Sequence, residues 1–298
     1  MDFVSQIGVL VPMLTGEMGL AQLTAVRQHE SLGPALANHY GHRPDAELLD
    51  ELGADHYHLF GLEVFPYASV FFNENAHMGG VLPGQVAEFY ALRGLERPSE
   101  PDHLGRELAL LANLVEAGDE KATASFFWRY LMSWYFPFAE AVKALQHPFY
   151  NALFDQLESL LAVLGSQLEP IPAQIEEPEA EPLEALDQQE TGIGDISEFL
   201  LAPRLAGFFL SRTALKEMGE RIDMPTGFGT RSTLLPQIFY TAVDYDRLPA
   251  LLEELDRIAA AQQERYNALA QGWPGMLDYW LGRVAVIRAM LSKMKAAV

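Results

Sequence analysis

Apolar residues recur at steps of three and four along most of the 298-residue chain, and no long run alternates between apolar and polar positions. This spacing predicts amphipathic helices rather than half-buried strands. Within residues 100–118, for example, Leu104, Leu108 and Leu111 fall on one face, and Gly118 stands where a C-terminal cap is expected. We therefore expect an all-α protein.

The same periodicity predicts further helices in both halves of the chain. In the first half it is carried by two sets of apolar residues: Phe126, Tyr130, Trp134 and Phe138, and then Leu153, Leu157, Leu160, Leu161 and Leu164. In the second half it covers residues 212–222, 232–243, 247–270 and 274–297. Ser211 is suited to cap the first of these, and Pro274 is expected in the first turn of the last.

An abrupt change of composition separates the two halves. Residues 166–190 are rich in glutamate and proline and contain no basic residue. Proline interrupts helices and uncompensated carboxylates repel each other, so this segment is expected to be an extended, solvated linker. We therefore expect a helical domain over residues 1–165, an acidic linker over 166–190 and a second helical region over 191–298.

The net charge of the chain disfavours some kinds of binding partner and favours others. The chain has 41 acidic and 20 basic residues, a formal net charge of −21, and no cysteine. This charge disfavours nucleic acid and anionic membranes and favours basic peptides, although an acidic surface also serves solubility alone. Without cysteine there is no disulfide and no thiolate metal site, which fits a reducing cytoplasm. No segment is apolar and long enough to predict insertion into a membrane, and the N-terminal stretch lacks the positive region of a secretory signal.

The start of the 100–118 helix carries unusual polar chemistry. Ser99 or Glu100 is placed to cap it, Pro101 is tolerated in its first turn, and Asp102 puts negative charge near the positive end of the helix dipole. Capping does not require His103. Taken alone, an imidazole there is most often a partly buried histidine bonded to a nearby carbonyl or carboxylate.

The whole region resembles the TorD/DmsD/NarJ family of redox-enzyme maturation chaperones. The family signature E-x-P-x-D-H is similar to Glu100-Pro101-Asp102-His103, which is one residue more compact after the glutamate. Two flanking blocks follow in the family's order. The matching residues are Tyr57, Leu59, Phe60, Pro66, Tyr67 and Ser69 upstream, and Phe126, Leu131, Trp134, Pro148, Phe149 and Tyr150 downstream. The resemblance covers about residues 1–165.

The resemblance implies an all-helical, TorD-like chaperone in the cytoplasm that is not an enzyme and has no cofactor or metal of its own. Its partner would be an apo-molybdoenzyme or the twin-arginine signal peptide of that enzyme, held until the cofactor is inserted and the enzyme exported. The alternative is an assembly or scaffold protein that binds a mature-domain segment and does not recognise a signal peptide. A homodimer stays open.

Two groups of residues are candidates for the peptide site. Glu100, Asp102 and His103 form the polar group at the helix start. The aromatic candidates are Tyr57, Phe60, Tyr67, Trp128 and Trp134. For each aromatic residue taken singly, a place in the core is about twice as common as a place in a ligand surface.

Other chemistry is disfavoured by the sequence. His56 and His58 with Asp55 suggest a metal site, but residues two apart on a helix point away from each other, so we interpret both histidines as structural. No phosphate loop or nucleophile elbow is present, which argues against a nucleotide hydrolase or a serine hydrolase. Residues 208–219 faintly resemble a twin-arginine signal, but the second arginine is missing and a helix capped by Ser211 is the favoured interpretation.

Overall fold

The computed structural model describes residues 2–172, 175–187 and 191–297. Helices account for nearly all of the regular structure. Within the described residues the only β-type pairing is one antiparallel bridge, between Tyr67 and His103. The all-α prediction is confirmed.

The chain forms two compact units. The first consists of residues 1–68 and 79–173, and the second of residues 69–78 and 174–298. Helix α5 (Ala68–Phe72) begins at the end of the first stretch, so the second unit contains a short segment taken from the first half of the chain. The boundaries expected from the sequence, at residues 166 and 190, stay a prediction.

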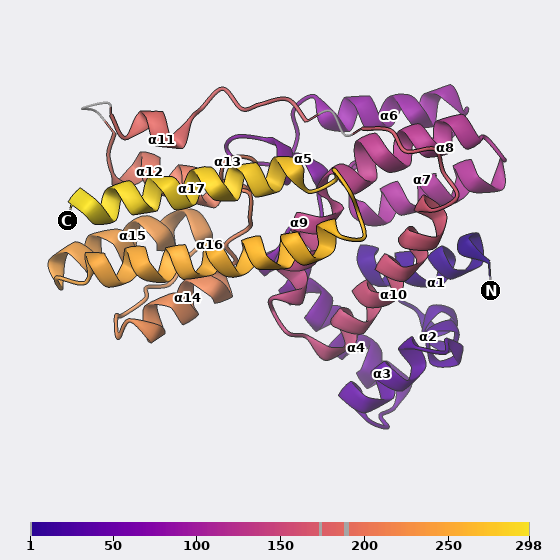
Figure 1. The fold of residues 1–298 in the computed structure, drawn as a ribbon. Coiled ribbons are helices and arrows are strands. Elements are labelled where there is room, and N and C mark those ends of the chain that lie inside the picture. The colour runs from indigo at the N-terminus through magenta and orange to yellow at the C-terminus, as the bar shows by residue number, and fades with distance from the viewer. Residues whose placement is uncertain (1, 173–174, 188–190, 298) are drawn as a thin grey trace. The chain divides into compact units, whose positions relative to one another are not determined.

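The first unit is a bundle of short helices that encloses an aromatic core. Its elements, shown from indigo to magenta and rose in Figure 1, are α1 (Phe3–Thr15), α2 (Leu20–Gln28), α3 (Leu32–Tyr40), α4 (Asp45–His56), the π-helix η1 (Tyr57–Glu63), α6 (Leu82–Leu92), α7 (Leu104–Glu116), α8 (Glu120–Phe126), the π-helix η2 (Phe127–Leu131), α9 (Met132–Lys143) and α10 (Pro148–Gly165). Helix α1 packs on α7 and α10, and α10 also packs on α3 and α9.

Helix α9 is the most deeply buried element of this unit. Its aromatic side chains, Trp134, Tyr135, Phe136 and Phe138, are all almost completely buried. A helix that is apolar on every side has no solvent-facing stripe and is stable only when other helices surround it. Helix α9 therefore lies inside the unit, where it packs on η2 and α10.

The second unit is built around two long helices. Its elements are α11 (Pro182–Ala185), α12 (Ile193–Leu201), α13 (Pro203–Ala206), α14 (Arg212–Arg221), α15 (Arg231–Asp244), α16 (Leu248–Ala270) and α17 (Asp278–Ala297). Figure 1 shows α16 and α17, in orange and yellow, running side by side, and their packing is the most extensive in this unit.

Two local expectations for the second unit have different outcomes. Ser211 caps α14 as predicted, because its hydroxyl oxygen accepts a hydrogen bond from the backbone N–H of Ala214 at 3.0 Å. The prediction that Pro274 lies in the first turn of the last helix is wrong. Helix α17 begins at Asp278, and Pro274 lies in the turn before it.

The acidic segment is tied to the second unit by basic side chains. The guanidinium of Arg283, which is almost fully buried in α17, pairs with the Glu181 carboxylate at 3.0 Å, and Lys293 pairs with Asp187. Arg204 donates a hydrogen bond to the backbone carbonyl of Glu176. These cations come from distant parts of the sequence and offset the repulsion expected among the carboxylates. Residues 173, 174 and 188–190 of this segment lie outside the described residues.

In the part of the chain that the structure describes, no helix combines the length and the apolar character needed to cross a bilayer.

Candidate peptide-binding site

The helix with the polar start is α7, and it begins later than the sequence suggests. Its N-cap is His103, not Ser99 or Glu100: the imidazole Nδ1 accepts a hydrogen bond from the backbone N–H of Gly105 at 3.1 Å. An acceptor at this position satisfies one of the backbone donors that every helix start leaves unpaired. Capping therefore explains the histidine that the sequence left unexplained, and the prediction of an earlier cap is wrong.

Backbone pairing fixes this helix start to the segment before α5. The N–H of Leu104 donates to the carbonyl of Pro66 at 2.9 Å, and the N–H of Ala68 donates to the carbonyl of Asp102 at 3.0 Å. The rings of Tyr67 and His103 meet edge to face, with centroids 5.1 Å apart. Two of the family blocks, separated by more than thirty residues in sequence, are thus joined at one place.

Close packing against α1 requires a glycine in the first turn of α7. A Cβ atom at Gly105 would lie 2.6 Å from the Cγ2 atom of Thr15, closer than Cβ contacts in folded proteins. The glycine lets the backbone of α7 approach the C-terminal end of α1. This approach closes one wall of the site.

A hollow of about 220 Å³ lies beside this helix start. Its walls come from the end of α1, from the junction of α4 and η1, and from the segments around Pro66 and Glu100. The residues that matter most for its chemistry are Thr15, His56, Tyr57, Tyr67, Glu100 and Arg106. The volume is below that of a typical small-molecule pocket and suits one long side chain of a larger ligand.

The π-helix η1 presents an aromatic ring at the edge of the hollow. Tyr57 is 63% exposed, although aromatic residues of this size are usually more buried. A Cβ atom at Gly61 would lie 2.8 Å from the Tyr57 ring, so this glycine makes room for the ring on the π-helical turn. Widened turns of this kind are rare in proteins as a whole, and those that occur are often found at functional sites.

The charge of the hollow is set by one carboxylate. Arg106 is paired with Glu17 at 2.6 Å, which neutralises the cation in the wall. The Glu100 carboxylate accepts a hydrogen bond from the Tyr67 hydroxyl at 3.0 Å and is otherwise exposed. Burial and this carboxylate raise the pKa of Tyr67 to about 12, so the tyrosine remains a hydrogen-bond donor. The arrangement can accept a cationic group at Glu100 with an aromatic ring beside it.

The imidazole of the helix cap stays neutral. Burial, together with the nearby Arg106 and His56, lowers the pKa of His103 to about 4. A neutral imidazole is required for Nδ1 to accept the Gly105 N–H. His103 therefore acts at neutral pH as an uncharged acceptor that shapes the wall.

The sequence-based candidates divide into those at the hollow and those away from it. Tyr57, Phe60, Tyr67, Glu100 and His103 line it. Asp102 is 3% exposed and lies behind this wall, where its backbone carbonyl takes part in the pairing with Ala68.

The two tryptophan candidates lie elsewhere in the first unit. Trp134 is fully buried in the core, and its indole N–H donates to the Glu107 carboxyl group at 3.0 Å. Trp128 is also buried, and its ring packs edge to face on that of Phe127. Neither contributes to the hollow.

Sequence reasoning did not propose five of the residues that line the hollow, which are Thr15, His56, Gly61, Pro66 and Arg106. Arg106 and Thr15 line the hollow, and His56 does so while donating from Nε2 to the backbone carbonyl of Leu14 at 3.0 Å. The local pattern contains no signal for Thr15 or His56, because their roles depend on the packing of α1 against α4 and α7. Arg106 lies only three residues after His103, and residues three apart on a helix are neighbours, so its place beside His103 could have been predicted from the sequence.

No group of side chains placed to hold a metal ion is found at the hollow among the residues that the structure describes. Among the described residues, the group of side chains that could hold a metal ion is His39, Asp55 and His147, outside the hollow.

Comparison with known proteins gives one family match, which lies mostly in the first unit. Residues 22–156 match the family model described as nitrate reductase delta subunit. This match confirms the predicted resemblance to the TorD/DmsD/NarJ family and spans most of the hollow, from α4 through the start of α7. No curated protein matches the chain.

Proposed function

Because residues 22–156 match the family model described as nitrate reductase delta subunit, a family of redox-enzyme maturation chaperones, we propose that this protein holds a molybdenum-dependent oxidoreductase during its maturation and binds the twin-arginine signal peptide of that enzyme. In this role it binds and releases its client and catalyses no reaction. Binding takes place before export, in the cytoplasm.

The observation that carries this proposal is the hollow beside the start of α7, whose lining includes both the Glu100 carboxylate and the exposed ring of Tyr57. An arginine guanidinium forms paired hydrogen bonds with a carboxylate and also stacks on aromatic faces. We assign one arginine of the peptide to this hollow, with its guanidinium on Glu100 and its methylene groups against Phe60 and Tyr57.

The net charge supports the same partner. At a formal charge of −21 the protein attracts a basic peptide over long distances, which raises the association rate at low ionic strength. Asp102 and His103 hold the wall of the hollow in place. A direct contact between Asp102 and the peptide stays a prediction.

A titration with synthetic peptides tests the proposal. The full-length protein is titrated with a twin-arginine signal peptide and with the same peptide in which both arginines are lysine, at low and at moderate salt. We expect the arginine peptide to bind at least tenfold more tightly, since lysine offers no planar pair of donors.

The second candidate function is that of a scaffold for a mature-domain segment. Equal affinity for both peptides, or no binding of either, would favour this scaffold over signal-peptide recognition. Co-purification of a molybdoenzyme that lacks its signal peptide would then support the scaffold directly.

A further inference from the structure

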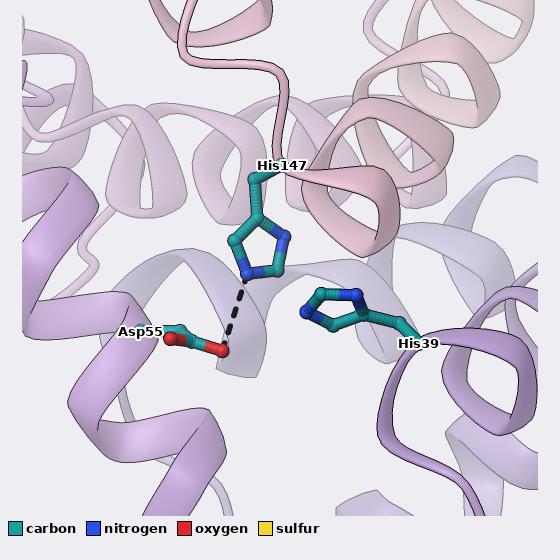
Figure 2. Close-up of side chains that lie close together, drawn as sticks. All are labelled: His39, Asp55 and His147. Atoms are coloured by element: carbon teal, nitrogen blue, oxygen red, sulfur yellow. Dashed lines mark hydrogen bonds and ion pairs between the residues drawn. The ribbon is translucent and has the colours of Figure 1, made fainter.

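Outside the hollow, three side chains from separate helices converge in the first unit. His39 comes from the last turn of α3, Asp55 from the last turn of α4, and His147 is the residue before α10 (Figure 2). One ligand atom of each, a ring nitrogen or a carboxylate oxygen, lies within 4.8 Å of the other two. The Nε2 atom of His147 lies 3.1 Å from Oδ2 of Asp55, and the two imidazole centroids are 4.5 Å apart.

We propose that His39, Asp55 and His147 form a binding site for a divalent transition-metal ion, with Zn²⁺ as the expected ion and water completing its coordination. Two imidazoles and one carboxylate are a ligand set that zinc accepts, with bonds of about 2.0–2.2 Å and a fourth position left for water. Tetrahedral bonds of that length place ligand atoms about 3.3 Å apart. The separation of Asp55 and His147 already matches this, and His39 needs only a small side-chain movement.

His39 is the residue that distinguishes this cluster from a structural network. It is exposed, and within the described part of the chain neither of its ring nitrogens has a hydrogen-bond partner. In Figure 2 one of these nitrogens faces the space between Asp55 and His147. A histidine held edge to face against a second imidazole, with a free nitrogen directed at a carboxylate, is pre-positioned to bind a cation.

The surroundings hold Asp55 and His147 in place. The Tyr40 hydroxyl donates to Oδ2 of Asp55 at 2.8 Å, and the Nδ1 atom of His147 accepts the backbone N–H of Tyr150 at 3.3 Å. The bond from Tyr40 is of the kind that orients a metal-binding carboxylate.

The position of the proton on His147 changes when an ion binds. In the metal-free protein the Nδ1 atom of His147 accepts the backbone N–H of Tyr150 and therefore carries no proton. Its Nε2 carries the proton that Asp55 accepts. An ion that binds Nε2 shifts this proton to Nδ1, which then no longer accepts the backbone N–H of Tyr150. Binding therefore exchanges two hydrogen bonds of His147, the one to Asp55 and the one from Tyr150, for three metal bonds that link α3, α4 and α10.

Zinc titration of the full-length protein tests the site. The protein is produced without a polyhistidine tag, stripped with EDTA and titrated with ZnCl₂ at pH 7.5 by calorimetry. We expect one zinc per chain and a rise in Tm on binding. Cobalt, used as a visible probe, should give the intense absorption bands of a tetrahedral site.

Matched variants keep the test decisive. His39→Ala removes an exposed side chain and Asp55→Asn keeps an acceptor for Tyr40, so both should unfold in EDTA at the wild-type temperature and bind zinc at least tenfold more weakly. His58→Ala, an exposed histidine of η1 outside the cluster, should bind as the wild type does. The proposal is overturned if the stripped protein binds no zinc, or if His39→Ala binds zinc as tightly as His58→Ala does.

Discussion

Trp134 donates its indole N–H to Oε2 of Glu107 at 3.0 Å, inside the core of the first unit. Glu107 lies on α7, one helical turn after the cap residue His103. Glu107 is completely buried, and its Oε1 atom has no hydrogen-bond partner among the described residues. Burial is the main cause that raises the pKa of this carboxyl group well above its usual value of 4.5. Burial therefore favours the neutral acid form of this side chain.

This raised pKa predicts a pH dependence of stability. When pH rises above 4.5 the unfolded chain loses the Glu107 proton while the folded chain retains it, so the contribution of Glu107 is lost as pH rises toward the pKa of the folded state. The slope from one such group is at most about 1.4 kcal/mol per pH unit. In Glu107→Gln this slope should be absent.

Urea unfolding of the wild type and Glu107→Gln at several pH values between 5 and 8 measures this difference. The stability of the variant relative to the wild type should increase with pH, whatever the constant offset between them. Glu116→Gln, at the exposed end of the same helix, should follow the wild-type slope. Parallel curves for Glu107→Gln and the wild type would show that Glu107 is ionised in the folded protein.

The close contact at Gly105 predicts that alanine substitutions at two glycines of the first unit change the free energy of unfolding in opposite directions. Gly105→Ala places a Cβ atom 2.6 Å from Thr15 and should cost about 1–3 kcal/mol, because α1 and α7 must move apart. Gly8→Ala, on the exposed side of α1, has nothing within 4 Å and should stabilise that helix by about 0.5–1 kcal/mol. Urea unfolding monitored by circular dichroism compares them, and equal effects of the two substitutions would contradict the close approach of α7 to α1.

The contacts of Arg283 predict that its loss lowers the stability of the second unit and exposes the acidic segment to proteolysis. Its guanidinium donates to the backbone carbonyl of Leu205 at 3.2 Å as well as to Glu181. Arg283→Ala should destabilise the second unit by about 2 kcal/mol, less than the loss of a fully buried pair because the Glu181 side chain is 35% exposed and can be hydrated. Limited proteolysis should then cleave residues 175–187 faster than in the wild type.

The control for this experiment is a surface ion pair in the same unit. Glu217→Gln removes the exposed partner of Arg221 and should change stability by less than about 0.5 kcal/mol, with no effect on cleavage. If Arg283→Ala behaves like Glu217→Gln, the acidic segment is not held by Arg283.

The local pattern predicted the elements well, because helical spacing and caps are properties of neighbouring residues. Leu104, Leu108 and Leu111 are completely buried on one face of α7, as their spacing indicates, and Ser211 caps α14. The errors lie at helix starts, where several residues compete. The N-cap of α7 is His103 and not Glu100, because the backbone pairing of Leu104 with Pro66 fixes where the helix begins. That long-range pairing is not visible in a local pattern.

The parts of the site that depend on long-range packing could not be predicted. Asp55 was considered with its neighbours His56 and His58, but the fold brings it instead to His39 and His147, sixteen and ninety-two residues away. His56 turns to the backbone of Leu14. Likewise, the burial of Glu107 follows from the position of α7 between other helices, since an acidic residue in a helix is usually a solvent-exposed one.

The central claim is that the carboxylate at the hollow recognises an arginine of the client, and one measurement tests it most directly. The dissociation constant of a twin-arginine peptide is measured for the wild type, Glu100→Gln and Glu116→Gln at the same salt concentration. Loss of a charge-assisted hydrogen bond of about 1.5–3 kcal/mol predicts that Glu100→Gln weakens binding at least tenfold, whereas Glu116→Gln, with the same change in net charge, leaves it within twofold. If both variants bind the peptide as tightly as the wild type, or both weaken equally, the hollow at the start of α7 is not the arginine site.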